Sequence, residues 1–501
     1  MTNLSKNLAK IIVLLYNKQV IQKLSGVNMK KKLLSLIICV LLVGVMAISM
    51  VACTESYKQD AIATDLTDKT VESNGGLAVR VGKYLYFING YGEATGENDF
   101  GEAVKGAIMR VELENNAPKD GTLVTIVPKN VYNTNTKVGL TVSGDYIYYT
   151  SPSIEKGSDG TAKTANMWIM RTKLDGTDTQ VLVKLEDYTT NFRIAGNYLV
   201  YQDKEYNLHA IDLTSKKLKD EIVKEEISTA MLAYSYESAL PGVVFFTTTA
   251  ENKTESHNEI WAFVNGETKK VIDGRYSYDA STLAHKNGYS LSILDVQSVG
   301  GKTRLIYTKT DSGANTTSKG DYYYDFDANY TFSASNEVRM TSGVNYTAYK
   351  FFDGNNALAS DSDSVDYLRV VDGKWVSDVV IKASSATLMD VEVINNEVIA
   401  TYLASSVVYE IKILEKNDNT YAKELSSAKT IFNSKFNSTW LGLDLVGDVI
   451  YFFNSDVKNN AYYLDLAKVV DRNTNTLLPT QLGKFSAEDN YAMLEGATES
   501  K

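Results

Sequence analysis

The sequence contains only three histidines, the residue type most often used as a catalytic acid or base. None of them has a second histidine or a cysteine at the spacing of a metal-binding motif. We interpret His209 as a strand residue, His257 as a loop residue among acidic neighbours, and His285 as a residue that precedes a turn. The histidines therefore predict no metal centre, and we expect no cofactor.

Two acidic clusters have the alternating spacing with which calcium loops present their oxygen ligands. The sixth position of both loops lacks the glycine that a calcium loop needs for its sharp turn. The twelfth position, where a glutamate is expected, carries Asn336 in the first loop and Asp372 in the second. The sequence therefore favours solvated acidic loops over calcium sites. The clusters are Asp325, Asp327 and Asn329, and Asp361, Asp363 and Asp366.

Other catalytic signatures are missing from the sequence, including a nucleophile elbow, a phosphate loop and a dinucleotide fingerprint. A carboxylate pair for glycoside cleavage cannot be identified, because the separation of the two groups is set by the fold. The four tryptophans, which could form a carbohydrate platform, are Trp168, Trp261, Trp375 and Trp440. Trp168 and Trp261 lie in strand-like runs, where core packing is the better interpretation. We therefore predict a protein that is not an enzyme.

The elements that must position these side chains form a repeat. Each copy has a turn residue, usually glycine, and then a short run of aromatic or β-branched residues. A second such run follows each copy, as a hairpin requires. The copies start at intervals of 42 to 66 residues, at Gly82, Gly144, Gly196 and Gly447, with weaker copies at Gly242, Gly288, Gly354 and Asn396.

Several of these runs are almost continuously apolar, a pattern that indicates strands covered on both faces. Blades stacked radially satisfy this requirement, so we predict an all-β protein, a β-propeller of seven or eight blades over residues 75–485. We expect the segment 77–81 to pair with 477–482 and close the ring. The alternative is two smaller propellers divided near residues 313–320. Residues 216–231 are expected to form a short helix or a charged hairpin, and 486–501 a polar tail with a short helix.

The second copy of the repeat resembles a known family most closely. Tyr148-Tyr149-Thr150-Ser151 resembles the YWTD signature of low-density-lipoprotein-receptor propellers, and the segment 168–176 resembles the strand and turn that follow it. Those propellers have six blades, fewer than the eight copies here. The chain resembles clostridial-type lipoproteins with receptor-like propellers of unknown function, and this resemblance implies a binding role.

A secretory signal precedes the repeats. Met29 is followed by three lysines and by an uncharged apolar run from 33 to 52. The junction Met50-Val51-Ala52-Cys53 resembles the lipobox of bacterial lipoproteins, which implies lipidation, including palmitate, on Cys53. A transmembrane helix is the alternative. Either arrangement leaves the rest of the chain on the extracytoplasmic face of the cell membrane. Residues 53–74 are predicted to form a flexible tether, whereas 1–28 fit neither interpretation, so that translation could start at Met29.

Charge narrows the range of partners. Residues 1–52 hold seven lysines and no acidic residue, so removing them from a net charge of −10 leaves −17. Such an acidic chain argues against nucleic acid as a partner. Cys39 and Cys53 are the two cysteines, so the mature part contains no disulfide. We expect a lipid-anchored cell-surface binding protein, with a cell-wall glycan or an envelope protein as ligand. The alternative is an anchored lyase or hydrolase that acts on polysaccharide.

Overall fold

The computed structural model describes a large part of the chain beyond residue 59. The described residues are 60–89, 106–128, 131, 139–153, 158, 166–185, 191–230, 242–249, 258–279, 284–311, 319–343, 346–382, 387–394, 397–404, 408–417, 420–421, 433–435, 443–454, 460–465 and 480–482. The predicted signal peptide, Cys53 and the predicted C-terminal helix lie outside them. Residues 53–59 of the predicted tether do so as well, whereas 60–74 are described.

Antiparallel sheets make up nearly all of this described part, and four of them precede residue 274. Sheet one contains β1 (Val71–Glu72), β2 (Ala78–Val81), β3 (Tyr84–Ile88), β4 (Ile108–Glu114), β5 (Ala117–Pro118) and β6 (Val124–Val127). Sheet two contains β7 (Thr141–Ser143), β8 (Tyr146–Pro152), β9 (Met167–Lys173) and β10 (Gln180–Lys184). Sheet three contains β11 (Phe192–Ala195), β12 (Tyr198–Gln202), β13 (Leu208–Asp212) and β14 (Asp220–Lys224). Sheet four contains β15 (Thr229–Ala230), β16 (Val243–Thr249), β17 (Asn258–Val264) and β18 (Glu267–Asp273).

Four more sheets follow in chain order. Sheet five contains β19 (Arg275–Asp279), β20 (Ala284–Val299), β21 (Lys302–Asp311), β22 (Gly320–Phe326) and β23 (Val338–Arg339), with the 3-10 helix η2 (Ala334–Asn336) before β23. Sheet six contains β24 (Ala348–Asp353), β25 (Asn356–Ser360), β26 (Ser364–Val371) and β27 (Lys374–Lys382). Sheet seven contains β28 (Thr387–Ile394), β29 (Glu397–Ala404), β30 (Val408–Asn417), β31 (Thr420–Tyr421) and β32 (Asn433–Lys435). Sheet eight contains β33 (Leu443–Val446), β34 (Val449–Asn454), β35 (Asn460–Asp465) and β36 (Thr480–Gln481).

The turn glycines of the predicted repeat join the first two main strands of their sheets. Gly82, Gly144, Gly196 and Gly447 all have φ between +54° and +59°, a left-handed conformation that glycine adopts without a steric penalty. The copy predicted to start at Gly288 is wrong, because Gly288 lies inside the 16-residue strand β20. The corresponding turn in sheet five is Gly300-Gly301.

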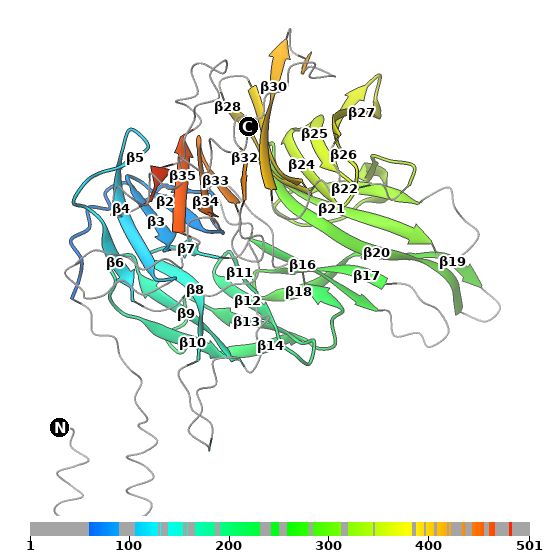
Figure 1. The fold of residues 1–501 in the computed structure, drawn as a ribbon. Helices are drawn as coiled ribbons and strands as arrows, with labels where there is room; N and C mark the ends of the chain where they lie inside the picture. Colours follow the sequence, from blue (N-terminus) through cyan, green and yellow to red (C-terminus); the bar gives the residue numbers. More distant parts are fainter. Residues whose placement is uncertain are drawn as a thin grey trace, which may run out of the picture. The chain divides into compact units, whose positions relative to one another are not determined.

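Neighbouring sheets pack face to face through apolar side chains. Buried clusters join sheet two to three, three to four, four to five, five to six, and six to seven, and β28 contacts β33 of sheet eight. One further cluster contains residues of sheets one, two and eight, and β2 contacts β33 (Figure 1). Each sheet therefore packs on the next, and the eighth packs on the first. The chain is an all-β protein with a β-propeller fold, and its eight sheets match the higher of the two expected blade counts.

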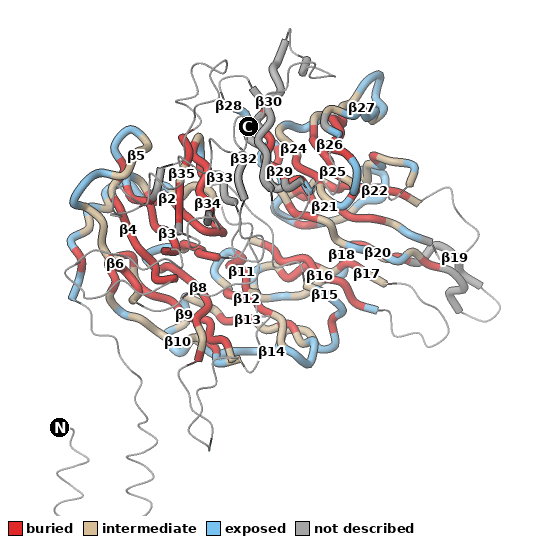
Figure 2. Tube along the Cα trace, in the orientation of Figure 1, coloured by how far each residue is buried: buried red, intermediate tan, exposed pale blue. Residues whose placement is uncertain are grey.

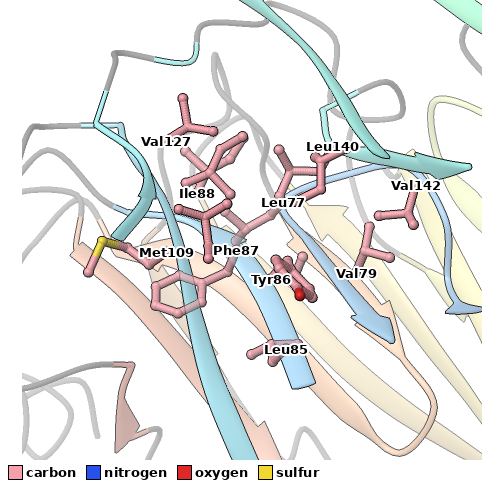
Figure 3. Close-up of a cluster of buried hydrophobic side chains, with 14 of the residues drawn as sticks. Leu77, Val79, Leu85, Tyr86, Phe87, Ile88, Met109, Val127, Leu140 and Val142 are labelled. Carbon is pink, nitrogen blue, oxygen red and sulfur yellow. The ribbon is translucent and has the colours of Figure 1, made fainter. Parts of the chain in front are cut away.

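Burial follows this arrangement. In sheets one and three the second main strand is mostly buried, and so is the leading strand β11, whereas the outer strand β14 is largely exposed (Figure 2). Tyr86 and Phe87 of β3 are almost fully buried, and they belong to one cluster with Leu77, Leu140 and Val142 (Figure 3). Each such side chain contributes roughly 1.5–3 kcal/mol by leaving water.

Two expectations from the sequence are wrong. The strand at 78–81 pairs with β1 and β3, whereas Thr480–Gln481 pairs with β35, so no blade is shared between the two ends. The segment near 313–320 does not divide two propellers, because β21 and β22 on either side of it pair within sheet five. Of the two alternatives for residues 216–231, the charged hairpin is confirmed, because β14 at 220–224 pairs antiparallel with β13.

We call the first main strand of each sheet its leading strand. Side-chain amides and one hydroxyl of one sheet form hydrogen bonds with the backbone of the leading strand in the next sheet. Asn74 donates to the Val142 carbonyl of β7 and accepts from the Val142 N–H, both at 2.7 Å. Asn258 makes the same reciprocal pair with Leu291 of β20. The remaining bonds of this kind join Gln202 to Ala230 of β15, Gln297 to Tyr349 and Phe351 of β24, and Ser360 to Leu388 of β28.

We expect Asn74→Ala to lower the free energy of unfolding by about 3 kcal/mol. Asn74 is only 1% exposed, so the change leaves the Val142 N–H and C=O without their partner in a buried interface. Urea unfolding measures the loss. The control is Asn329→Ala, an exposed asparagine, which should change stability by less than about 0.5 kcal/mol. Equal losses in the two variants would contradict the role of Asn74 between sheets one and two.

Candidate functional site

His209 lies on β13 between two carboxylates. Its Nε2 atom is 2.9 Å from Oδ2 of Asp203, and its Nδ1 atom is 3.1 Å from Oδ1 of Asp220. The ring stacks on Tyr201, with centroids 4.6 Å apart, and the Tyr201 hydroxyl donates to Oδ2 of Asp220 at 2.5 Å. Asn207 completes the cluster, since its side chain donates to Asp203. This group, which we call the His209 cluster, connects β12, β13 and β14.

The electrostatics of the His209 cluster favour a charged imidazole. Burial acts to lower the pKa of His209, but hydrogen bonds and charge attraction from Asp220 and Asp203 outweigh it and raise this pKa. A neutral imidazole can donate from only one nitrogen, whereas the imidazolium donates to both carboxylates. Burial also raises the pKa of the Tyr201 hydroxyl well above its usual value. With both nitrogens engaged, His209 braces three strands and is poorly placed to accept a proton from a substrate.

The other predicted site residues are scattered. His285 lies in β20, and His257 lies outside the described residues. Trp168 is buried in the cluster of sheets one, two and eight, so core packing is confirmed for it, whereas Trp261 is partly buried and packs against the cluster that contains Phe246. Trp440 also lies outside the described residues.

The acidic clusters stabilise their own turns and strands. In the first cluster, Oδ1 of Asp327 accepts from the backbone N–H of Asn329 at 3.1 Å. In the second, Oδ1 of Asp361 accepts from two successive backbone N–H groups, both at 2.7 Å. Asp366 accepts from the hydroxyl groups of Tyr346 and Ser364. Within the described ranges, no group of three or more His, Cys, Asp or Glu residues is arranged to hold a metal ion.

Trp375 lies in a pocket between sheets five and six. The pocket has a volume of about 440 Å³, which is within the usual size of small-molecule sites. Two rings form part of its wall, since Trp375 of β27 meets Tyr323 of β22 edge to face at 6.1 Å. The lining residues are Tyr323, Val338, Arg339, Met340, Thr341, Ser342, Asn355, Val370, Gly373, Lys374 and Trp375.

A buried guanidinium fixes the aromatic wall of this pocket. Arg304 is 2% exposed and lies between the rings of Tyr323 and Phe351, 3.9 and 4.3 Å from their centroids. It forms a two-pronged ion pair with Asp325, at 2.6 and 2.7 Å, which holds its plane between the rings. The Phe351 ring in turn meets Trp375 edge to face. The positions of Tyr323 and Trp375 are thus set by packing before any ligand arrives.

Sequence reasoning missed most of this pocket. It named Trp375 among four tryptophans without distinguishing it, and it assigned no role to Tyr323, Arg339, Asn355 or Lys374. One local signal was present, because the Asp372-Gly373 turn places Lys374 and Trp375 at the start of the outer strand of sheet six. The partner wall comes from sheet five, more than 30 residues earlier in the chain, and no local pattern connects the two.

Comparisons with known proteins show only distant similarity. The chain matches no family model, and it matches none of the curated proteins. Among solved structures it is similar to a prolyl endopeptidase, with 13% identity over 66% of this chain and 46% of that chain, at a TM-score of 0.39. It is also similar to the β-propeller domain of the trilobed protease from Pyrococcus furiosus, with 11% identity over 72% and 96% of the two chains, at a TM-score of 0.36. BamB from Moraxella catarrhalis gives 8% identity, 80% and 98% coverage and a TM-score of 0.38.

These likenesses do not assign an activity. The chain spans less than half the length of the prolyl endopeptidase that it resembles, and all three identities are low. In the described part of the molecule, no helix has both the length and the apolar character needed to cross a membrane.

We expect the His209 cluster to stabilise the fold at low pH more than at high pH. A raised folded-state pKa means that the stabilisation is complete below the unfolded value of about 6.5 and is lost as pH rises through the folded value. The difference in unfolding free energy between wild type and His209→Gln should therefore shrink from about pH 6 to about pH 9. Urea unfolding at each pH measures it.

The matched control is Ile222→Ala, which removes an exposed side chain opposite His209 on β14. Its effect on the unfolding free energy should not vary with pH, because isoleucine does not titrate. If the His209→Gln difference stayed constant or grew toward alkaline pH, the imidazolium would not be the stabilising form.

Proposed function

We propose that this chain is a lipid-anchored cell-surface protein whose propeller binds a glycan in the pocket between sheets five and six. The observation that carries the proposal is the pair of aromatic rings, Tyr323 and Trp375, in a pocket that also offers amide, hydroxyl and cationic groups. The β-propeller fold supports a binding role, because it presents many turns and outer strands on a rigid scaffold.

A sugar suits this lining better than a purely apolar ligand. Sugar rings have a C–H face that packs on an aromatic ring, and hydroxyl groups that need hydrogen-bond partners when they leave water. Trp375 and Tyr323 offer the aromatic surface, whereas Asn355, Thr341 and Ser342 offer polar groups. Because the rings are already fixed by Arg304 and Phe351, binding loses little side-chain freedom.

The anchor is the second part of the proposal. The lipobox-like junction at Cys53 supports lipidation at that residue, and the lysines before the apolar run support an extracytoplasmic location for the propeller. A glycan-binding domain held at the outer face of the membrane would meet cell-wall polysaccharide as its nearest ligand.

We expect Trp375→Ala to weaken glycan binding at least about tenfold, since it removes one aromatic face of the pocket. The full-length protein, purified in detergent, is applied to a glycan array, and the affinity for each bound glycan is then measured by calorimetry. Tyr206→Ala is the control, because Tyr206 is an exposed aromatic residue in the turn between β12 and β13, at 60% exposure. Urea unfolding of both variants separates lost binding from lost folding.

Two results would count against glycan binding in this pocket. One is an array on which no glycan is bound. The other is a bound glycan whose affinity falls equally in the Trp375 and Tyr206 variants. Turnover of a bound glycan to shorter products would instead favour the alternative, a polysaccharide lyase or hydrolase.

We expect Cys53→Ala to leave an unprocessed precursor or to release the protein from the membrane fraction. Lipidation requires the cysteine thiol, and alanine cannot replace it. Fractionation of cells, followed by an immunoblot for precursor and mature forms, measures the outcome. Cys39→Ala, within the apolar run, is the control and should leave processing unchanged. Mature Cys53→Ala protein that stays in the membrane fraction would refute lipidation at this residue.

A further inference from the structure

The pocket between sheets five and six has a charge opposite to that of the whole chain. Of its eleven lining residues, Arg339 and Lys374 are basic and none is acidic. The whole chain has 61 acidic against 51 basic residues. A basic lining on an acidic protein creates a local positive potential. Such a potential attracts anionic ligands and has little effect on neutral ones.

The two cations reach the pocket from opposite walls. Arg339 belongs to β23 of sheet five, where its Nε donates to the Thr341 carbonyl at 2.9 Å and another nitrogen donates to the Lys319 carbonyl. These two carbonyls orient the guanidinium beside the pocket. Lys374 begins β27 of sheet six, is exposed, and has no ion-pair partner among the residues that the structure describes.

Asp353, two residues before the lining residue Asn355, is an acidic group engaged in its own turn. The carboxylate of Asp353 accepts from the backbone N–H of Asn355 at 2.8 Å and from the Asn356 side chain at 2.8 and 2.9 Å. These bonds hold Asp353 in the turn between β24 and β25, on the side of the pocket where Asn355 offers its own polar group. An anionic ligand would therefore place its charge toward Lys374 and Arg339.

We infer that the ligand of this pocket is an acidic sugar, with its ring on Trp375 and its negative group between Lys374 and Arg339. The inference rests on the proposed glycan binding and specifies the class of glycan. The negative group is a carboxylate, sulfate or phosphate carried on the sugar, because each of these accepts charge-assisted hydrogen bonds from lysine and arginine. The aromatic wall excludes a small inorganic anion as the best ligand, since such an anion has no face to pack on a ring.

The experiment compares charged and neutral forms of one sugar. The full-length protein in detergent is titrated with an oligogalacturonate and with its fully methyl-esterified form, which has the same rings without the charge. A glycan array with sulfated and phosphorylated members runs alongside, so that the kind of negative group is identified. The variants are Lys374→Gln and, on the same strand but outside the pocket lining, Lys382→Gln as the matched control.

We expect acidic glycans to bind more tightly than their neutral counterparts. Loss of one charged partner should weaken binding of an acidic glycan about tenfold. Lys374→Gln should therefore lower the affinity for acidic glycans by that factor and leave the affinity for neutral glycans unchanged. Lys382→Gln should change neither. Raising the salt concentration should narrow the difference between acidic and neutral glycans, because salt screens the exposed Lys374 charge.

The outcomes separate this inference from the proposed function. If neutral glycans bind as tightly as acidic ones, and Trp375→Ala still abolishes binding, the acidic class is wrong and glycan binding stands. The same conclusion follows if acidic glycans bind but Lys374→Gln and Lys382→Gln have equal effects. If no glycan of either kind binds, the proposed function fails and this inference fails with it.

Discussion

The leading strand of most sheets is an edge strand, and the structure depends on how its backbone is satisfied. β7, β15, β24 and β28 pair on one side only, yet they lie where neighbouring sheets pack together. A buried N–H or C=O without a partner costs as much as a lost hydrogen bond, so these edges need acceptors and donors from elsewhere. A side chain of the preceding sheet binds peptide groups of each edge strand that have no partner within their own sheet. These side chains are Asn74, Gln202, Gln297 and Ser360.

This solution explains how the ring of sheets closes. A propeller can close by building one blade from both chain ends, and that closure was expected for 77–81 with 477–482. Here every sheet is assembled from one continuous stretch of chain, and sheet eight meets sheet one through packed side chains that include Val446, Tyr451 and Val79. Because side-chain bonds and apolar packing already join the sheets elsewhere, closure by the same means requires no exchanged strand.

The repeat and the fold class could be predicted from the sequence because both depend on patterns of a few consecutive residues. A turn glycine with a positive φ and a continuous apolar run identify a strand pair without knowledge of its neighbours, as at Gly82 and Gly144. The prediction was wrong in sheet five, since β20 continues through Gly288 for 16 residues and the turn lies at Gly300-Gly301. A glycine in a strand and a glycine in a turn look alike when only a few residues are considered.

The candidate site was harder to predict, because its two walls belong to different sheets. Trp375 stands out in the sequence only as a rare residue, and what distinguishes it from Trp168 is its partner surface. Trp168 is buried within the cluster of sheets one, two and eight, whereas Trp375 is only partly buried against the cluster of sheets five and six and lines the pocket there. Strands β20 and β24 of these two sheets are in contact, and the pocket lies farther out, where β27 faces sheet five. The chemistry of the pocket lining can therefore vary with exposed outer-strand residues such as Lys374, because these residues contribute little to packing between the sheets.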